Sequence, residues 1–291
     1  MKHAKFKISL ILLGILLLIS ALAAWEGMQH DSDGILIHVI DVGQADCLVI
    51  ETDSGNIMID TGTDISEERL RAYLRSHGLR EFSYLILSHP HDDHIGNADM
   101  ILKEFKVDRV LCADCTSQDA VWNHFMTAME MAGREKGTEW IKPVSGTVCY
   151  VGRLRLEVLM APLEGNGGEN KDSLIVRAEF GSCSMLLTGD ADADEEEQLL
   201  AAVPAEKLKA DFLKVAHHGS SGSSTETFLQ AVSPRWAVIS CGVGNSFSHP
   251  HEEVLNRLRE ENAEIYQTDL SGSLIFFCDG TSFSLKTLFV K

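Results

Sequence analysis

Histidine and aspartate gather in three short segments of this 291-residue chain. The first segment reads His89-Pro90-His91-Asp92-Asp93-His94, so five of six consecutive side chains can ligate a metal ion. Two imidazoles two positions apart in a loop can face one ion, and an adjacent Asp and His can face a second ion about 3.5–4 Å away. We therefore predict that His89, His91, Asp93 and His94 bind one or two divalent cations.

Two later segments complete the predicted ligand set. Asp190 ends the segment Leu187-Thr188-Gly189-Asp190, just after an expected strand, and we expect its carboxylate to bridge the metal ions. His217 and His218 follow another expected strand. Because adjacent strand residues point to opposite sides, we expect only one of the two to ligate a metal. His218, next to Gly219, is the preferred ligand, and the other ring would support the site or face the substrate.

This ligand set predicts hydrolysis by an activated water. A divalent cation lowers the pKa of a bound water toward neutrality, and the resulting hydroxide attacks the scissile centre. Asp93 or His249 is expected to protonate the leaving group. His249, in Ser248-His249-Pro250-His251, is also expected to contact substrate or an oxyanion. Ligation rich in histidine and without thiols favours Zn²⁺, while the carboxylates leave Mn²⁺ as the alternative.

Four polar residues early in the chain could support the ligands. Asp41, Gln44, Asp46 and Asp60 are expected to orient ligand side chains and to brace the loops that carry them. Capping of a local turn is the alternative role for each of them.

The elements that must position these residues alternate between strand and helix in two halves of similar plan. Apolar runs at 35–42, 47–52, 84–87, 154–160 and 212–216 predict buried strands. Residues 174–180 and 184–188 predict a hairpin across Gly181-Ser182, and Asp279-Gly280 predicts a second one. We expect an α/β fold with two mixed sheets between helical layers, an αββα sandwich, over residues 35–291.

The N-terminus predicts export. Lys2, Lys5 and Lys7 precede an uncharged apolar run over residues 8–25, which is the layout of an export signal. As a helix this run would be about 27 Å long, so residues 1–25 form either a cleaved signal peptide or a retained membrane anchor. Residues 26–34 are the expected linker. Either outcome places the domain outside the cytoplasm, secreted or anchored to the membrane.

Composition limits the classes of protein that fit. The chain is 45% hydrophobic, which excludes an intrinsically disordered protein. It carries 43 acidic and 25 basic residues, a net charge of −18. Broad electrostatic binding to a nucleic acid backbone needs Lys and Arg, so this charge argues against it. The seven cysteines cannot all pair within the chain.

Together with the early Asp60-Thr61-Gly62, the motifs H-x-H-x-D-H, T-G-D and H-H-G-S resemble those of the metallo-β-lactamase-fold hydrolases. Segments 38–46, 88–97, 187–190, 214–220 and 248–251 together resemble the extracytoplasmic metallo-β-lactamase domain of the DNA-uptake competence protein ComEC, over about residues 35–280. The resemblance implies the αββα sandwich, a metal-dependent hydrolase and nuclease activity.

This sequence departs from that family at two points. The many-helix membrane channel of the family has no counterpart in these 291 residues. Many dinuclear members also supply a third histidine to the first metal from the region before T-G-D, and here no histidine lies between His124 and His217. Asn170 and Ser173 occupy that region, as an Asn-x-x-Ser does in the ComEC-like subgroup, and we expect them to support the site.

The sequence therefore predicts an exported metal-dependent phosphodiesterase that uses no nucleotide cofactor. Its substrate would be DNA or a cell-envelope polymer containing phosphodiesters. Two other functions remain open: hydrolysis of amide or ester bonds, and a non-catalytic metal-binding role in an envelope or DNA-uptake assembly.

Overall fold

The computed structural model describes residues 34–113, 119–162 and 173–288, and their strands form two sheets. The first sheet has the spatial order β15 (Phe283–Leu288), β14 (Leu274–Cys278), β1 (Ile35–Val39), β2 (Leu48–Thr52), β3 (Gly55–Ile59), β4 (Glu81–Leu87), β5 (Lys106–Cys112) and β6 (Glu139–Ile141). The second has the order β13 (Glu264–Gln267), β12 (Trp236–Ile239), β11 (Phe212–Lys214), β10 (Cys183–Leu187), β9 (Ile175–Phe180), β8 (Leu154–Met160) and β7 (Val148–Val151).

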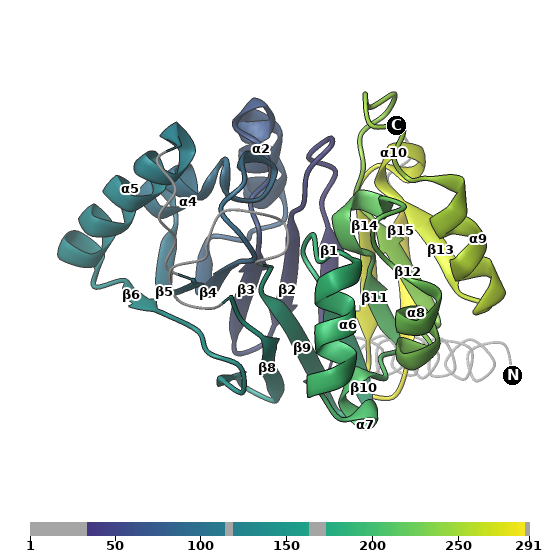
Figure 1. Cartoon of the computed structure of the whole chain (residues 1–291). Coiled ribbons are helices and arrows are strands. Elements are labelled where there is room, and N and C mark those ends of the chain that lie inside the picture. Colours follow the sequence, from purple (N-terminus) through teal and green to yellow (C-terminus); the bar gives the residue numbers. More distant parts are fainter. Residues whose placement is uncertain (1–33, 114–118, 163–172, 289–291) are drawn as a thin grey trace, which may run out of the picture. The chain divides into compact units, whose positions relative to one another are not determined.

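Helices cover the outer faces of both sheets (Figure 1). Those of the first half are η1 (Asp64–Ser66), α2 (Glu67–Ser76), α3 (Asp92–Ile95), α4 (Ala98–Glu104) and α5 (Ala120–Lys136). Those of the second half are α6 (Ala193–Ala202), α7 (Ala205–Leu208), η3 (Ala216–Gly219), α8 (Glu226–Val232), α9 (Glu252–Glu260) and α10 (Thr268–Ser271). The predicted αββα sandwich is confirmed.

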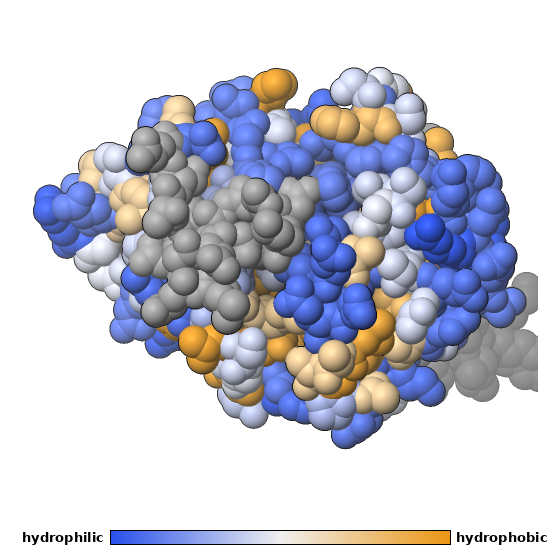
Figure 2. Space-filling model, in the orientation of Figure 1, coloured by the Kyte–Doolittle hydropathy of each residue, from blue (hydrophilic) through white to orange (hydrophobic). Residues whose placement is uncertain are grey.

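Hydrophobic periodicity explains the layering. Ile35, Ile37 and Val39 alternate along β1 and enter the core between the sheets. Leu70 and Leu74, four residues apart on α2, face the separate core between the first sheet and its helices. A third core lies between the second sheet and α6, α8 and α9. Figure 2 shows a largely hydrophilic surface, with apolar side chains gathered around the lower ends of α6 and α7.

Strand direction brings the functional loops to one edge. β3, β4 and β5 are parallel, and β1 runs the same way because β2 is antiparallel to both β1 and β3. In the second sheet β10, β11 and β12 are parallel. The segments after β1, β3, β4, β10, β11 and β12 carry the predicted site residues, so each sheet delivers its share from the carboxyl ends of its strands.

Several local predictions are confirmed and others need correction. Phe180 pairs with Cys183 in the predicted β9–β10 hairpin, and β14 and β15 pair around Asp279-Gly280. The strand expected at 212–216 ends at Lys214, and η3 begins two residues later at Ala216. The short edge strands β6 and β13 and the single-turn helices α3, α7 and α10 were not predicted, because three or four residues show no clear periodicity.

Some predictions fall outside the described residues. These are the export signal or anchor at 1–25, residues 26–33 of the linker, and the support role of Asn170. Among the residues that the structure does describe, no helix is both long and apolar enough to cross a membrane.

Candidate metal centre

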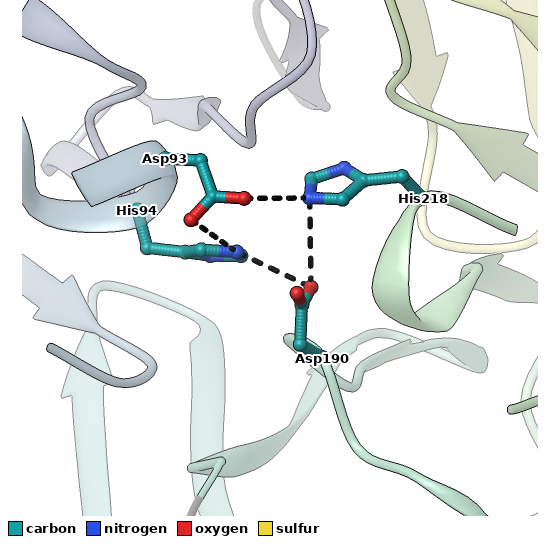
Figure 3. Close-up of side chains that lie close together, drawn as sticks. All are labelled: Asp93, His94, Asp190 and His218. Atoms are coloured by element: carbon teal, nitrogen blue, oxygen red, sulfur yellow. Dashed lines mark hydrogen bonds and ion pairs between the residues drawn. The ribbon is translucent and has the colours of Figure 1, made fainter. Parts of the chain in front are cut away.

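Four side chains converge where the edges of the two sheets meet (Figure 3). Asp93 and His94 come from α3, Asp190 follows β10, and His218 lies in η3. His94 Nε2 lies 3.2 Å from Asp190 Oδ1, and His218 Nε2 lies 3.3 Å from Asp93 Oδ2 and 3.7 Å from Asp190 Oδ1. One ligand atom from each residue lies within 4.8 Å of all the others, so the four could hold one cation.

His89 and His91 form a neighbouring group with Asp93. His89 Nε2 lies 3.2 Å from His91 Nδ1, and one atom from each of the three residues lies within 4.8 Å of the others. His89 is buried, whereas His91 and Asp93 are partly exposed. The structure thus brings together the ligands expected in the first motif, in two groups that share Asp93. The shared carboxylate is an arrangement suited to two adjacent cations.

Both His217 and His218 face Asp190, contrary to our expectation of opposite directions. His217 Nε2 lies 3.7 Å from Asp190 Oδ2, and His218 Nε2 lies 3.7 Å from Asp190 Oδ1. The expectation failed because β11 ends at Lys214 and both histidines adopt left-handed backbone angles, with φ of 48° and 54°. Strand alternation therefore does not apply to them. His218 is buried, while the His217 side chain is 29% exposed.

The glycine of the T-G-D motif permits close backbone approach. Gly189 has φ +52°, and a Cβ atom there would lie 2.9 Å from Ser88 Cβ. Because Ser88 directly precedes the first histidine motif, this contact fixes the distance between the two loops that carry the site. A larger residue would push Asp190 away from His94.

Asp60 holds the ring of His94. Its Oδ2 atom accepts a hydrogen bond from His94 Nδ1 at 2.9 Å, which leaves Nε2 directed at Asp190. Ser88 fixes the Asp60 carboxylate by donating from its backbone N and from its Oγ, both at 2.8 Å. Sequence reasoning missed Ser88, although its position between a buried strand and the histidine motif was the available signal.

Asp46 braces His218 through a buried ion pair. His218 Nδ1 donates to the Ser240 carbonyl at 2.9 Å and lies 3.5 Å from Asp46 Oδ1, so its Nε2 faces the site. Asp46 Oδ2 lies 2.9 Å from Lys214 Nζ, and both side chains are about 5% exposed. Lys214 was missed in the sequence. A single lysine within the apolar segment 212–216 was the signal that could have found it, since buried lysines need a partner.

The remaining expected support residues that the structure describes hydrogen-bond to different segments around the site. Ser173 Oγ accepts from the Asp190 backbone N at 3.0 Å, and the Ser173 backbone N donates to Glu195. Gln44 Oε1 accepts from Gly242 N at 3.0 Å. Asp41 Oδ1 accepts from Gly43 N and from Arg69, contacts that brace its own loop.

His249 lies beside the ligand group without belonging to it. Its ring packs edge-on against His217 at 5.8 Å and against His251 at 4.8 Å between centroids. Gln44 Nε2 lies 3.4 Å from its Nδ1. His251 is partly buried and accepts from the Ser221 backbone N. Burial and then His251 lower the pKa of His249 to about 4, so its ring is neutral at pH 7.

Charge in the cluster is balanced between imidazoles and carboxylates. Burial alone would lower the pKa of His218, but Asp190 and Asp46 outweigh burial and raise it to about 10. Asp190 and Asp60 likewise raise the pKa of His94 well above its usual value against the effect of burial. Burial raises the pKa of Asp93, yet His218 and His94 lower it to about 2. The carboxylates therefore stabilise positive charge between them.

The donor set fits a divalent cation. His94 Nε2 and Asp190 Oδ1 are fully buried, and neither makes a hydrogen bond to any described residue. The two atoms face one another 3.2 Å apart, and a buried nitrogen and oxygen that meet without a hydrogen bond are typical of a ligand site. Imidazole and carboxylate donors suit Zn²⁺ and Mn²⁺ alike.

Comparison with known proteins gives a family-model match and sequence relatives over most of this chain. The model of the metallo-beta-lactamase superfamily matches residues 40–117. The chain is 31% identical over 256 residues to ComE operon protein 3 of Bacillus subtilis, covering 82% of this chain and 32% of that protein. It is 28% identical over 261 residues to Competence protein ComA of Neisseria gonorrhoeae, covering 89% of this chain and 35% of that protein. The chain thus spans about a third of the length of these relatives.

Solved structures give the same fold. The metallo-beta-lactamase fold protein YhfI of Bacillus subtilis superposes with a TM-score of 0.57 at 13% identity, covering 84% of this chain and all of that one. Fold and relatives agree: the chain has the metallo-β-lactamase fold, matches the metallo-beta-lactamase superfamily over residues 40–117 and is similar to competence proteins over most of its length.

Proposed function

We propose that this chain is an exported metal-dependent phosphodiesterase. The observation that carries the proposal is the convergence of Asp93, His94, Asp190 and His218, with His89 and His91 alongside. Asp93, His94, Asp190 and His218 would hold one divalent cation, and His89 and His91 with Asp93 would hold a second, weaker one. Such cations, when bound, supply an activated water and neutralise charge that develops on phosphate oxygens.

The chain's own residues prepare this site in three ways. Asp60 fixes the ring of His94, and Asp46 and the Ser240 carbonyl fix the ring of His218. Both rings are held with Nε2 directed into the site, before any cation binds. Asp93, with a side chain 33% exposed, lies on the solvent side of the cluster, where a substrate can reach it. His249, neutral at pH 7, carries a proton on one ring nitrogen and can donate a hydrogen bond from it to a substrate oxygen, so of the two expected proton donors its part is that of an oxyanion contact.

The charge of the chain argues against tight binding of a nucleic acid duplex, so the family resemblance supports a phosphodiesterase more strongly than it supports DNA as the substrate. The chain has a net charge of −18, so few cationic side chains offset the repulsion of a polyphosphate. Recognition would then depend on contacts at the scissile group. The similarity to Competence protein ComA of Neisseria gonorrhoeae supports a role of this chain in competence.

Turnover by the purified full-length chain tests the proposal. We expect hydrolysis of bis(p-nitrophenyl) phosphate and of single-stranded DNA with Zn²⁺ or Mn²⁺, measured against duplex DNA and a β-lactam. Asp190→Asn should lower kcat at least 100-fold and reduce bound metal, measured by elemental analysis.

Asp108→Asn is the matched control. Its carboxylate is 49% exposed on β5, at the opposite end of the strand from the site, and the variant should keep wild-type activity. Metal binding without turnover of either phosphodiester would favour the non-catalytic accessory role. Equal rates for Asp190→Asn and wild type would refute catalysis at this centre.

A further inference from the structure

An exposed aromatic ring stands beside the proposed site. Phe247 is 62% exposed, in the segment between β12 and α9. Its ring stacks on His249, with centroids 5.6 Å apart and ring planes at 27°. His249 in turn contacts His217, which lies 3.7 Å from the Asp190 carboxylate. Single exposed apolar side chains are common, so it is the place of this ring, stacked on a histidine beside the candidate metal centre, that suggests contact with a substrate.

Hydrogen bonds hold the segment that carries this ring. Asn245 donates to the carbonyls of Gly242 and His249, and its Oδ1 accepts from the His249 backbone N. Gln44 ties the same segment to the loop after β1 through Gly242 N. Phe247 is thus presented by a segment cross-linked at several points, and an ordered ring loses little entropy when it stacks on a ligand.

We propose that Phe247 is a stacking platform for a nucleobase of the substrate, placed next to the scissile phosphodiester. This inference rests on the proposed phosphodiesterase function and specifies its substrate class as nucleotide diesters, in single-stranded form. Stacking requires an unpaired base, and it provides sequence-tolerant affinity without cationic side chains. It therefore suits a chain with a net charge of −18, which cannot rely on Lys and Arg to bind a phosphate backbone.

A pair of substrates with the same leaving group isolates the stacking contact. The p-nitrophenyl ester of thymidine 5′-phosphate carries a base, and methyl p-nitrophenyl phosphate does not. We expect the wild-type full-length protein, loaded with Zn²⁺ or Mn²⁺, to prefer the thymidine diester. Phe247→Ala should raise KM for the thymidine diester about 5- to 150-fold, the range of one base–aromatic stack. The KM for the methyl diester and kcat for both should stay within about twofold.

Two further variants separate stacking from loss of structure. Phe247→Trp should retain or improve KM for the thymidine diester. Tyr150→Ala removes another exposed aromatic ring, 64% exposed on the edge strand β7, and should change neither KM. If Phe247→Ala changed KM equally for both diesters, or if the wild type showed no preference for the thymidine diester, the proposal would be overturned. A protein-docking role for Phe247 predicts such results.

Binding without turnover keeps the two proposals distinguishable. Fluorescence anisotropy with a labelled oligothymidylate should show weaker binding by Phe247→Ala than by wild type and Phe247→Trp. If binding depends on residue 247 but neither diester is hydrolysed, the proposed phosphodiesterase function is refuted and the stacking proposal is supported. If both diesters are hydrolysed but binding is the same in wild type and Phe247→Ala, the stacking proposal is refuted and the phosphodiesterase function is supported.

Discussion

The buried pair of Lys214 and Asp46 gives the sharpest test of how the site is held. Lys214 Nζ lies 2.9 Å from Asp46 Oδ2, and the two side chains are 6% and 5% exposed. At that distance and an effective dielectric constant of 20, the gross attraction is about 6 kcal/mol. Lys214→Met keeps most of the side-chain volume but removes the nearer cation of the buried Asp46 carboxylate, which then has only His218, 3.5 Å away, as a charged partner. We expect a loss of about 3–5 kcal/mol in the free energy of unfolding.

Urea and thermal unfolding measure this loss. For a domain of this size about 2–4 °C of Tm corresponds to 1 kcal/mol, so Tm should fall by about 6–20 °C. Adding Asp46→Asn to Lys214→Met removes the carboxylate that has lost its lysine and should recover at least about 2 kcal/mol relative to the sum of the single variants.

An exposed pair provides the control. Lys106 Nζ lies 3.0 Å from Glu81 Oε2, nearly the same distance, but the side chains are 60% and 69% exposed. Lys106→Met should cost less than about 1 kcal/mol, because solvent screens the pair. If Lys214→Met costs no more than Lys106→Met, burial does not strengthen the pair and the reasoning fails.

Three other perturbations probe ligand orientation, metal and core. Asp60→Ala removes the carboxylate that orients His94 and should weaken metal binding about 10- to 100-fold by isothermal titration calorimetry, whereas Asp108→Ala should not. Free metal at 100 times its Kd should stabilise the fold by about 2.7 kcal/mol in urea unfolding, and excess chelator should abolish this gain, which Asp190→Asn should not show. Phe276→Ala should cost about 3–5 kcal/mol of unfolding free energy with metal binding intact, because this ring, fully buried between the sheets, packs against three aromatic rings.

Strand periodicity and strand ends explain why so much could be predicted from the sequence. The motifs that contain His89 and Asp190 follow apolar runs directly, and parallel strands deliver such segments to one edge. The resemblance in motif order then predicted the αββα sandwich. These arguments need only local sequence and the general rules of α/β folds.

Other features depend on contacts that no local pattern encodes. The left-handed turn at His217 and His218 follows from the early end of β11, where Gly219 packs against Pro250. Pattern reasoning extended that strand by two residues and so predicted opposite directions for the two rings. The Lys214–Asp46 pair likewise joins two sheets, and only the assembled fold shows that each is the other's partner.

The division of the site between the two sheets has a physical consequence. Asp93 and His94 follow a strand of the first sheet, whereas Asp190 and His218 follow strands of the second. Any ion held by all four would connect the sheets at the edge where their inner core ends. Metal affinity would then depend on how firmly Asp60 and Asp46 already hold the two imidazoles, since a preformed site needs less ordering on binding. Stability and metal affinity should therefore change together in Asp46 variants but separately in Phe276 variants.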